Sequence, residues 1–413
     1  MKKTIIIMAI LAAALVSCSK DAKPDYSFDG SISREVLENY LERSVTQVYF
    51  LHDGKPEGYT LPDKEDDIRM LLDIGAKFIG RSIYCWGGES KLNDPHFLNF
   101  ADSLTTRMHS YDPDMIFQGC LFEYVSADVN NVPVPAWAFE AFGLEPEQRN
   151  FCSADMVKRL DPDAPVRWGE RGGGVPMVNN METKLWFYYL AVSYINVGVE
   201  ALHLGQVELI SADDPDRSNY IELLDKIREY AAAYARRHYI LLDGHTPKGG
   251  FVVDGKSLLD FNSFPLRIKE VSEEPYKGIL EVGHSDGIYC RSKGAVSPSG
   301  WQADSMPYLV EFDNFGTNGK PGQPNPDDEF IWGYDDITWF STLSENDRND
   351  WLRYAYDWLH ATDSNGHLQM CTMRMITNPA LGRGRHAYYA NTRSETYPEG
   401  YSQEETIKSI WNR

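Results

Sequence analysis

Apolar, β-prone runs alternate with segments of helical period along most of this chain. Short apolar runs bounded by turn residues predict strands, and longer stretches with apolar positions three or four residues apart predict helices. The predicted strands are 45–51, 77–85, 115–122, 201–209, 238–242, 307–312 and 368–375. The predicted helices are 64–75, 95–109, 181–197, 219–237 and 344–361. Strand followed by helix, repeated, indicates a parallel sheet covered by helices.

One further strand, sixth in chain order, is expected between Phe264 and Arg291, where FPLRIKEV and GILEVGHSDGIYC both fit. A hairpin at 249–256 is expected in place of the preceding helix. Eight strand positions favour an α/β fold, a (β/α)8 TIM-type barrel, over a doubly wound sheet. We expect a single domain over 31–413, with long insertions after strands three and seven, at 125–180 and 314–335. Both follow the carboxyl ends of strands, where such barrels carry their sites.

The N-terminus forms a separate unit. Lys2 and Lys3 precede an apolar run at 5–16, which is too short to span a ~30 Å hydrocarbon core, so residues 1–17 are expected to be a cleaved signal peptide. Leu15-Val16-Ser17-Cys18 resembles the bacterial lipobox, which implies lipidation of Cys18. The alternative is an uncleaved N-terminal anchor.

The residues that follow the cysteine indicate how the protein is held. The polar segment 18–30 reads as a lipidated, flexible tether, which anchors the protein to a membrane without a spanning helix. By resemblance to lipoproteins of Gram-negative bacteria, Ser19 implies an outer-membrane location, at the cell surface or the periplasmic face.

Charge and motif content exclude several classes of function. The formal net charge is −21, from 61 acidic and 40 basic side chains, so nucleic acid is not an expected partner. No HExxH, HxH or clustered Cys/His pattern is present, and neither is a GxSxG elbow or a P-loop. We therefore expect no metal and no cofactor, while the oligomeric state stays open. Cys85, Cys120 and Cys371 lie in apolar runs and are expected to pack in the core.

Several predicted strands end in acidic residues. Glu208 lies at the end of the fourth strand and Glu311 at the end of the seventh, and Glu123 follows the third. The separation of Glu208 from Glu311 is close to that of three βα units, at roughly 31 residues each. Two carboxylates at the carboxyl rim of a barrel are what glycosidic hydrolysis requires, one to protonate the leaving oxygen and one to attack or to activate water.

This placement resembles the large clan of retaining (β/α)8 glycoside hydrolases, which carry an acid/base glutamate at strand four and a nucleophile glutamate at strand seven. The resemblance implies that Glu208 is the acid/base and Glu311 the nucleophile of a glycoside hydrolase acting on an extracellular or periplasmic carbohydrate. It departs from the clan at Val207, where an asparagine usually precedes the acid/base. The alternative is a glycan-binding lipoprotein without catalysis on the same scaffold, and retention or inversion at the anomeric carbon stays open.

Aromatic and polar residues around this pair are expected to contact the sugar. Trp86 and Trp301 are indoles in glycine-bordered loops, where a ring can stack on a pyranose. Glu123 and Asp313 are reserve carboxylates. The full set of expected substrate-binding residues is Trp86, Glu89, Glu123, Asn180, His203, Asp313, Trp301 and Trp332. Arg81 and Arg374 lie within strands, so we expect them to orient carboxylates.

Overall fold

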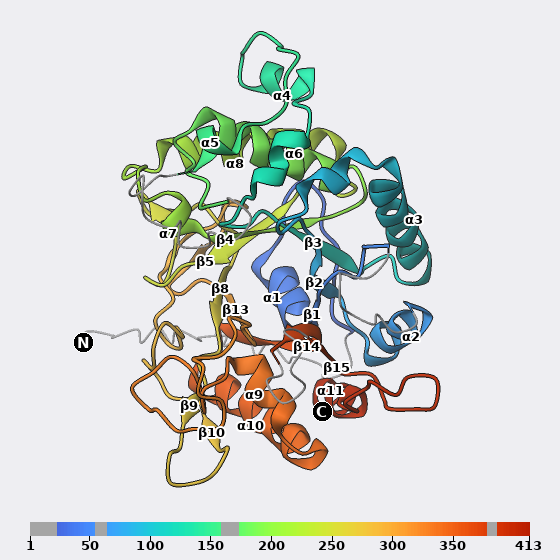
Figure 1. Cartoon of the computed structure of the whole chain (residues 1–413), viewed down its shortest axis with the longest axis vertical. Helices are drawn as coiled ribbons and strands as arrows, with labels where there is room; N and C mark the ends of the chain where they lie inside the picture. The colour runs from blue at the N-terminus through green and yellow to red at the C-terminus, as the bar shows by residue number, and fades with distance from the viewer. Residues whose placement is uncertain (1–22, 54–63, 158–172, 378–385) are drawn as a thin grey trace, which may run out of the picture.

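Eight parallel strands close into a barrel in this computed structural model (Figure 1). Their order is β1-β2-β3-β4-β5-β8-β13-β14, and β1 pairs with both β2 and β14, which completes the ring. The structure describes residues 23–53, 64–157, 173–377 and 386–413, so the expected signal peptide and Cys18 lie outside the described residues. The strands are β1 (Ser44–Gln47), β2 (Phe78–Ile83), β3 (Ile116–Cys120), β4 (Ala201–Gln206), β5 (Leu241–His245), β8 (Asn262–Pro265), β13 (Tyr308–Glu311) and β14 (Gly366–Ile376). The predicted (β/α)8 fold is confirmed.

The sixth barrel strand is β8, which begins two residues before the expected segment. The hairpin expected at 249–256 is present as β6 (Val252–Val253) and β7 (Lys256–Ser257), paired antiparallel. Small sheets also stand where a helix would cover the barrel between β8 and β13. They contain β9 (Lys269–Glu270), β10 (Gly278–Ile279), β11 (Ala295–Val296) and β12 (Gln302–Ala303). The second apolar run considered for the sixth strand therefore contributes β10 to a side sheet and no strand to the barrel.

The five helices predicted from periodicity are all present. They are α2 (Lys64–Ile74), α3 (Pro95–Tyr111), α6 (Met181–Ile195), α8 (Ser218–Tyr234) and α10 (Glu345–Thr362). Ser344 caps α10, because its hydroxyl accepts a hydrogen bond from the backbone N–H of Asp347. The shorter elements are η1 (Glu89–Asn93), η2 (Ala127–Asn131), α4 (Ala136–Ala141), α5 (Ser153–Met156), α7 (Val207–Ile210), α9 (Asp336–Thr342), α11 (Glu404–Trp411) and β15 (His386–Tyr389), which pairs antiparallel with β14. Within the described ranges no helix is long and apolar enough to cross a membrane.

The amino-terminal end of the barrel is closed by α1 (Arg34–Glu42), which lies over the centre of the ring in Figure 1. Leu37, Tyr40 and Leu41 are completely buried. They form one apolar cluster with residues at the starts of the strands, among them Phe78 and Ile116. The base of the barrel is therefore an apolar layer made by the segment that precedes β1.

Both long insertions stand at the carboxyl ends of their strands. The stretch after β3 contains η2, α4 and α5, and α4 projects from the top of the molecule in Figure 1. The stretch after β13, residues 314–335, ends where α9 begins. Cys85, Cys120 and Cys371 are buried, as the sequence indicates. The barrel therefore has an apolar base and a mouth surrounded by inserted loops.

Candidate functional site

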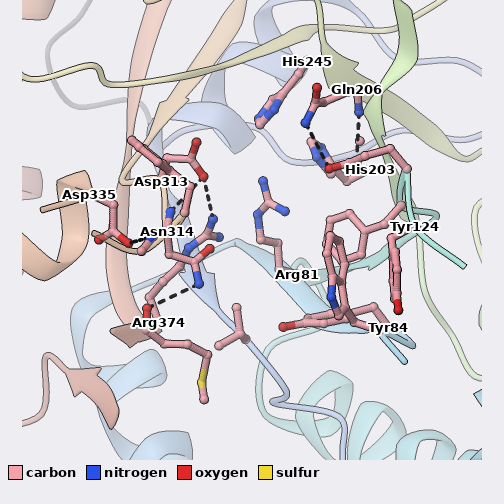
Figure 2. Close-up of a pocket in the computed structure, with 18 of the residues that line it drawn as sticks. Arg81, Tyr84, Tyr124, His203, Gln206, His245, Asp313, Asn314, Asp335 and Arg374 are labelled. Atoms are coloured by element: carbon pink, nitrogen blue, oxygen red, sulfur yellow. Dashed lines mark hydrogen bonds and ion pairs between the residues drawn. The ribbon is translucent and has the colours of Figure 1, made fainter. Parts of the chain in front are cut away.

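A cavity of about 500 Å³ opens at the carboxyl-terminal mouth of the barrel. Side chains and loops from β1, β2, β3, β4, β5, β13 and β14 line it, together with the start of the 314–335 insertion. Figure 2 shows the arginine side chains at its centre, with aromatic residues on one side and carboxylates on the other. This is the end of the barrel at which enzymes of this fold carry their sites.

One wall of the cavity is aromatic. Trp86 stacks on Tyr124 with ring centroids 5.0 Å apart, and Tyr84 stacks on Tyr49 at 4.6 Å. Phe122 makes edge contacts with both Tyr84 and Trp86. Trp86 is 38% exposed, so part of its indole faces solvent. The wall therefore offers flat apolar surface with polar edges, which suits the C–H faces of a sugar ring.

The opposite wall is polar and is built from the residues after β13. Asp313 forms ion pairs with Arg267 at 3.2 Å and Arg374 at 3.5 Å. Burial alone would raise the pKa of Asp313, but the charges of these arginines outweigh burial and lower the pKa. Asp335 also lines the cavity, yet it caps α9 and accepts N–H groups from Thr338 and Gly316, so both its oxygens are occupied by backbone.

Arg81 reaches the cavity because β2 is irregular at this residue. Its φ is +56°, and the pairing register of β2 with β3 shifts between Ile79 and Ile83. The Arg81 backbone N–H donates to the side chain of Gln118 on β3, at 3.0 Å, instead of to a backbone carbonyl of that strand. A strand irregularity of this kind re-aims a side chain, and here it directs the guanidinium toward Glu311.

Glu311 lies beneath Arg81 and Arg374 and is 2% exposed. Arg81 binds it through two nitrogens, with Nε 2.8 Å from Oε2 and Nη2 in contact with Oε1. Arg374 Nη1 is 3.3 Å from Oε2, and His245 Nε2 is 3.0 Å from Oε1. Burial would raise the pKa of Glu311, but the two arginines outweigh it and hold the pKa well below its usual range. The expectation that Arg81 and Arg374 orient a carboxylate is confirmed.

A second polar network lies beside Glu311. His203 Nδ1 is 2.7 Å from Asp243 Oδ2, and Gln118 Nε2 donates to Asp243 Oδ1 at 2.6 Å. The Ser263 hydroxyl also donates to Asp243. Burial, followed by the charge of Arg81, lowers the pKa of His203, which keeps the ring neutral.

Glu123 faces the cavity from the β3 side of the barrel. Its carboxylate accepts from the Gln206 backbone N–H at 3.2 Å and from the Gln206 amide at 3.3 Å. Gly205 has φ +61°, and a Cβ there would collide with the Glu123 carboxylate. Glycine is required at this position because the turn that ends β4 presses against Glu123.

The carboxylates expected to be catalytic are not brought together at this cavity. The chain leaves β4 at Gln206 and turns into α7, which carries Glu208 outward to an ion pair with Lys248 at 2.6 Å. Glu208 is not among the residues that line the cavity, and neither is Glu311, which lies below Arg81 and Arg374.

Of the eight residues expected to bind substrate, Trp86, Glu123, His203 and Asp313 line the cavity. The other four lie outside the cavity, where their side chains make hydrogen bonds to the backbone. Glu89 accepts from the Ser126 backbone, Asn180 donates to Met156, Trp301 donates to Ile32 and Trp332 donates to Lys277. Each of these side chains satisfies a polar group of the surrounding structure or completes the core.

The sequence assigns no role to Gln118, and it offers Asp243 and His245 only as possible metal ligands in a pattern that is common by chance. A signal existed in the pattern Asp243-Gly244-His245, because alternate residues of a strand point to the same side. In the barrel both side chains point inward, toward His203 and Glu311.

Comparisons with known proteins support the fold. No family model matches the chain, and no curated protein matches it. A solved cyclic alpha-maltosyl-(1→6)-maltose hydrolase from Arthrobacter globiformis matches with a TM-score of 0.51 at 10% identity, over 91% of this chain and 82% of that one. Ttha1563 from Thermus thermophilus matches with a TM-score of 0.48 at 12% identity, over 90% and 81% of the two chains. At 10% identity the likeness to the maltosyl-maltose hydrolase is one of fold, and it agrees with the closed barrel described above.

Proposed function

We propose that this protein is a glycoside hydrolase whose reacting carboxylates are Asp313 and Glu123. The observation that carries the proposal is their placement: both line the cavity, and β3 and β13 lie four strands apart in the eight-stranded ring. The carboxylates therefore face the cavity from opposite sides of the barrel. Hydrolysis of a glycosidic bond requires such a pair on either side of the bond. A hydrolase of a cyclic maltosyl-maltose shares the fold, which is consistent with this chemistry.

The partners of each carboxylate suggest which role it takes. Asp313 lies between the cationic groups of Arg267 and Arg374, which suits an anion that attacks the anomeric carbon or activates water. The partners of Glu123 in Gln206 are neutral amides, which stabilise the anion less than two arginines do, so we assign Glu123 to protonate the leaving oxygen. The stacked rings of Trp86 and Tyr124 would hold a sugar beside them.

The pair expected from strand position, Glu208 and Glu311, stays a prediction that the same experiment tests. Glu311 is held by Arg81 and Arg374, so in this proposal it positions those two arginines below the sugar. Removing one member of a buried ion pair costs about 3–5 kcal/mol of stability. Lost activity in Glu311→Gln is therefore informative only when the stability of the variant is measured as well.

The test uses the soluble chain from Asp25 onward against a panel of chromogenic α- and β-linked polysaccharides. On any substrate that the wild type cleaves, Asp313→Asn and Glu123→Gln should each lower kcat by about 10²–10⁴-fold while the substrate still binds. Glu208→Gln is the matched control, because its carboxylate pairs with Lys248 outside the cavity. Full activity in Asp313→Asn, or a loss in Glu208→Gln equal to the others, would overturn the assignment.

A second candidate, a glycan-binding protein without catalysis, is favoured by one observation. Asp313 is held by two arginines and Glu311 by two, so the strand-seven carboxylates are all neutralised by cations. This candidate predicts that the wild type binds a polysaccharide of the panel without releasing sugar, and that Trp86→Ala weakens the binding.

We propose further that the protein acts while held at the outer membrane through lipid on Cys18. The support is the order of a charged leader, an apolar run and a lipobox-like segment ending in Cys18. A polymeric substrate would then be met in the envelope or outside the cell.

A further inference from the structure

Three potential metal ligands converge at the floor of the cavity from three different strands. They are His203 on β4, His245 on β5 and Glu311 at the end of β13. One ligand atom from each lies within 4.8 Å of the other two. Two imidazole nitrogens and one carboxylate oxygen are a donor set that divalent transition metals bind.

His203 has a carboxylate behind its ring, as metal-binding histidines usually do. Its Nδ1 bonds to the Asp243 carboxylate, which places the ring hydrogen on Nδ1 and leaves the lone pair on Nε2. Asp243 is itself fixed by Gln118 and Ser263. His203 is 2% exposed, and its Nε2 has no hydrogen-bond partner among the described residues. A buried acceptor without a donor costs free energy, and a carboxylate behind a histidine is the usual support of a metal ligand.

His245 and Glu311 can join the same ion with a small rearrangement. His245 Nε2 and Glu311 Oε1 are now 3.0 Å apart, slightly closer than the ~3.3 Å that separates two ligands of one tetrahedral ion. A metal ion between them would replace this hydrogen bond and also the contact that Arg81 Nη2 makes with Oε1. The other oxygen, Oε2, would keep Arg81 Nε at 2.8 Å and Arg374 Nη1 at 3.3 Å, which fix the carboxylate.

We propose that His203, His245 and Glu311 form a binding site for one divalent transition-metal ion, for which Zn²⁺ is the probe. The site goes beyond the proposed hydrolase and does not depend on it. The donor atoms select the kind of metal, because two of the three are imidazole nitrogens. Glu311 is the one anionic ligand of the three, and two arginines lie against it. Calcium and magnesium require several oxygen ligands, so they should not bind here.

Zinc binding is measured on the chain from Asp25 onward, after a chelator has removed any bound metal. Equilibrium dialysis followed by metal analysis should give one tightly held Zn²⁺ per wild-type chain, and none of Ca²⁺ or Mg²⁺ in the same assay. His203→Ala and His245→Ala should each weaken zinc binding by at least about a hundredfold. Asp243→Asn, which alters the support and keeps all three ligands, should weaken it by about 10–100-fold.

The control variant is His360→Ala, which removes a half-exposed histidine of α10 that pairs with Glu42 on the outside of the barrel. It should leave zinc binding unchanged. A second readout does not depend on the variants folding: Co²⁺ bound to the wild type should show the absorption bands of a tetrahedral site, and one equivalent of Zn²⁺ should abolish them. Equal zinc binding in wild type, His203→Ala and His245→Ala, or no tight Zn²⁺ in the wild type, would overturn the proposal.

Discussion

Charged side chains buried in this protein are paired across large distances in the sequence. Arg81 meets Glu311 and Arg267 meets Asp313, each pair joining different strands or loops of the barrel. Asp67 on α2 is also buried, but it has neutral hydrogen-bond partners, the Tyr397 hydroxyl and the Asn391 amide. Burial therefore dominates, although the nearby charge of Lys64 opposes it, and the pKa of Asp67 is raised to about 6.

This raised pKa predicts a pH dependence of stability. The unfolded chain releases the Asp67 proton near pH 4, whereas the folded protein keeps it until about pH 6. The free energy of unfolding therefore falls as the pH rises from about 4 to about 6, the pKa of Asp67 in the folded protein. Asp67→Asn removes the titration, so raising the pH from 5 to 7.5 should destabilise the wild type relative to this variant by about 1 kcal/mol. Chemical denaturation at both pH values measures the difference, and Asp102→Asn on the exposed face of α3 is the control. An equal difference at the two pH values would contradict the prediction.

At the scale of elements, α1 and the apolar starts of the strands form a unit of their own. Ser33 caps the helix through its hydroxyl, and Val36, Leu37, Tyr40 and Leu41 are the residues that α1 buries. The Tyr40 hydroxyl also lies within hydrogen-bond distance of two backbone carbonyls at the base, 2.9 Å from that of Tyr26 and 2.8 Å from that of Asp114. The helix thus fills the end of the barrel opposite the cavity.

Replacing Leu37 by alanine should leave a cavity in this layer. The side chain is completely buried, so we expect Leu37→Ala to lower the free energy of unfolding by about 2–5 kcal/mol. Glu35→Ala, on the exposed side of the same helix, should change it by less than about 0.5 kcal/mol. Urea denaturation followed by circular dichroism compares the two, and similar values would show that α1 does not pack as described.

At the scale of the whole molecule, the architecture followed from sequence because its strands and helices differ in hydrophobic period. The position of the sixth strand is ambiguous in the sequence, because two apolar runs have the same pattern. The first overlaps the barrel strand β8, and the second contributes β10 to a side sheet. Glu208 was expected at a strand end because an apolar strand and a single helical turn cannot be told apart in a stretch as short as VELI. His203, His245 and Glu311 meet through closure of the barrel, which no local spacing encodes.

The proposed lipid anchor is also a property of the whole molecule, and it predicts a labelling result. When expressed in a Gram-negative bacterium with labelled palmitate, the wild-type protein should incorporate label and sediment with the outer membrane. Cys18→Ala should incorporate none. Cys290→Ala, which removes an exposed cysteine of the barrel, should label as the wild type does. Label in Cys18→Ala would refute lipidation at this residue.

The base formed by α1 has a consequence for orientation. Tyr26 and Ile32, which lead into α1, pack against the starts of the strands, so the chain enters the barrel at the end opposite the cavity. If the chain is held by a lipid a few residues earlier, this end faces the bilayer and the mouth opens away from it. A long polymer could then approach the aromatic wall without crossing the headgroup layer, whereas a lipid-linked sugar in the same membrane would have to reach around the barrel.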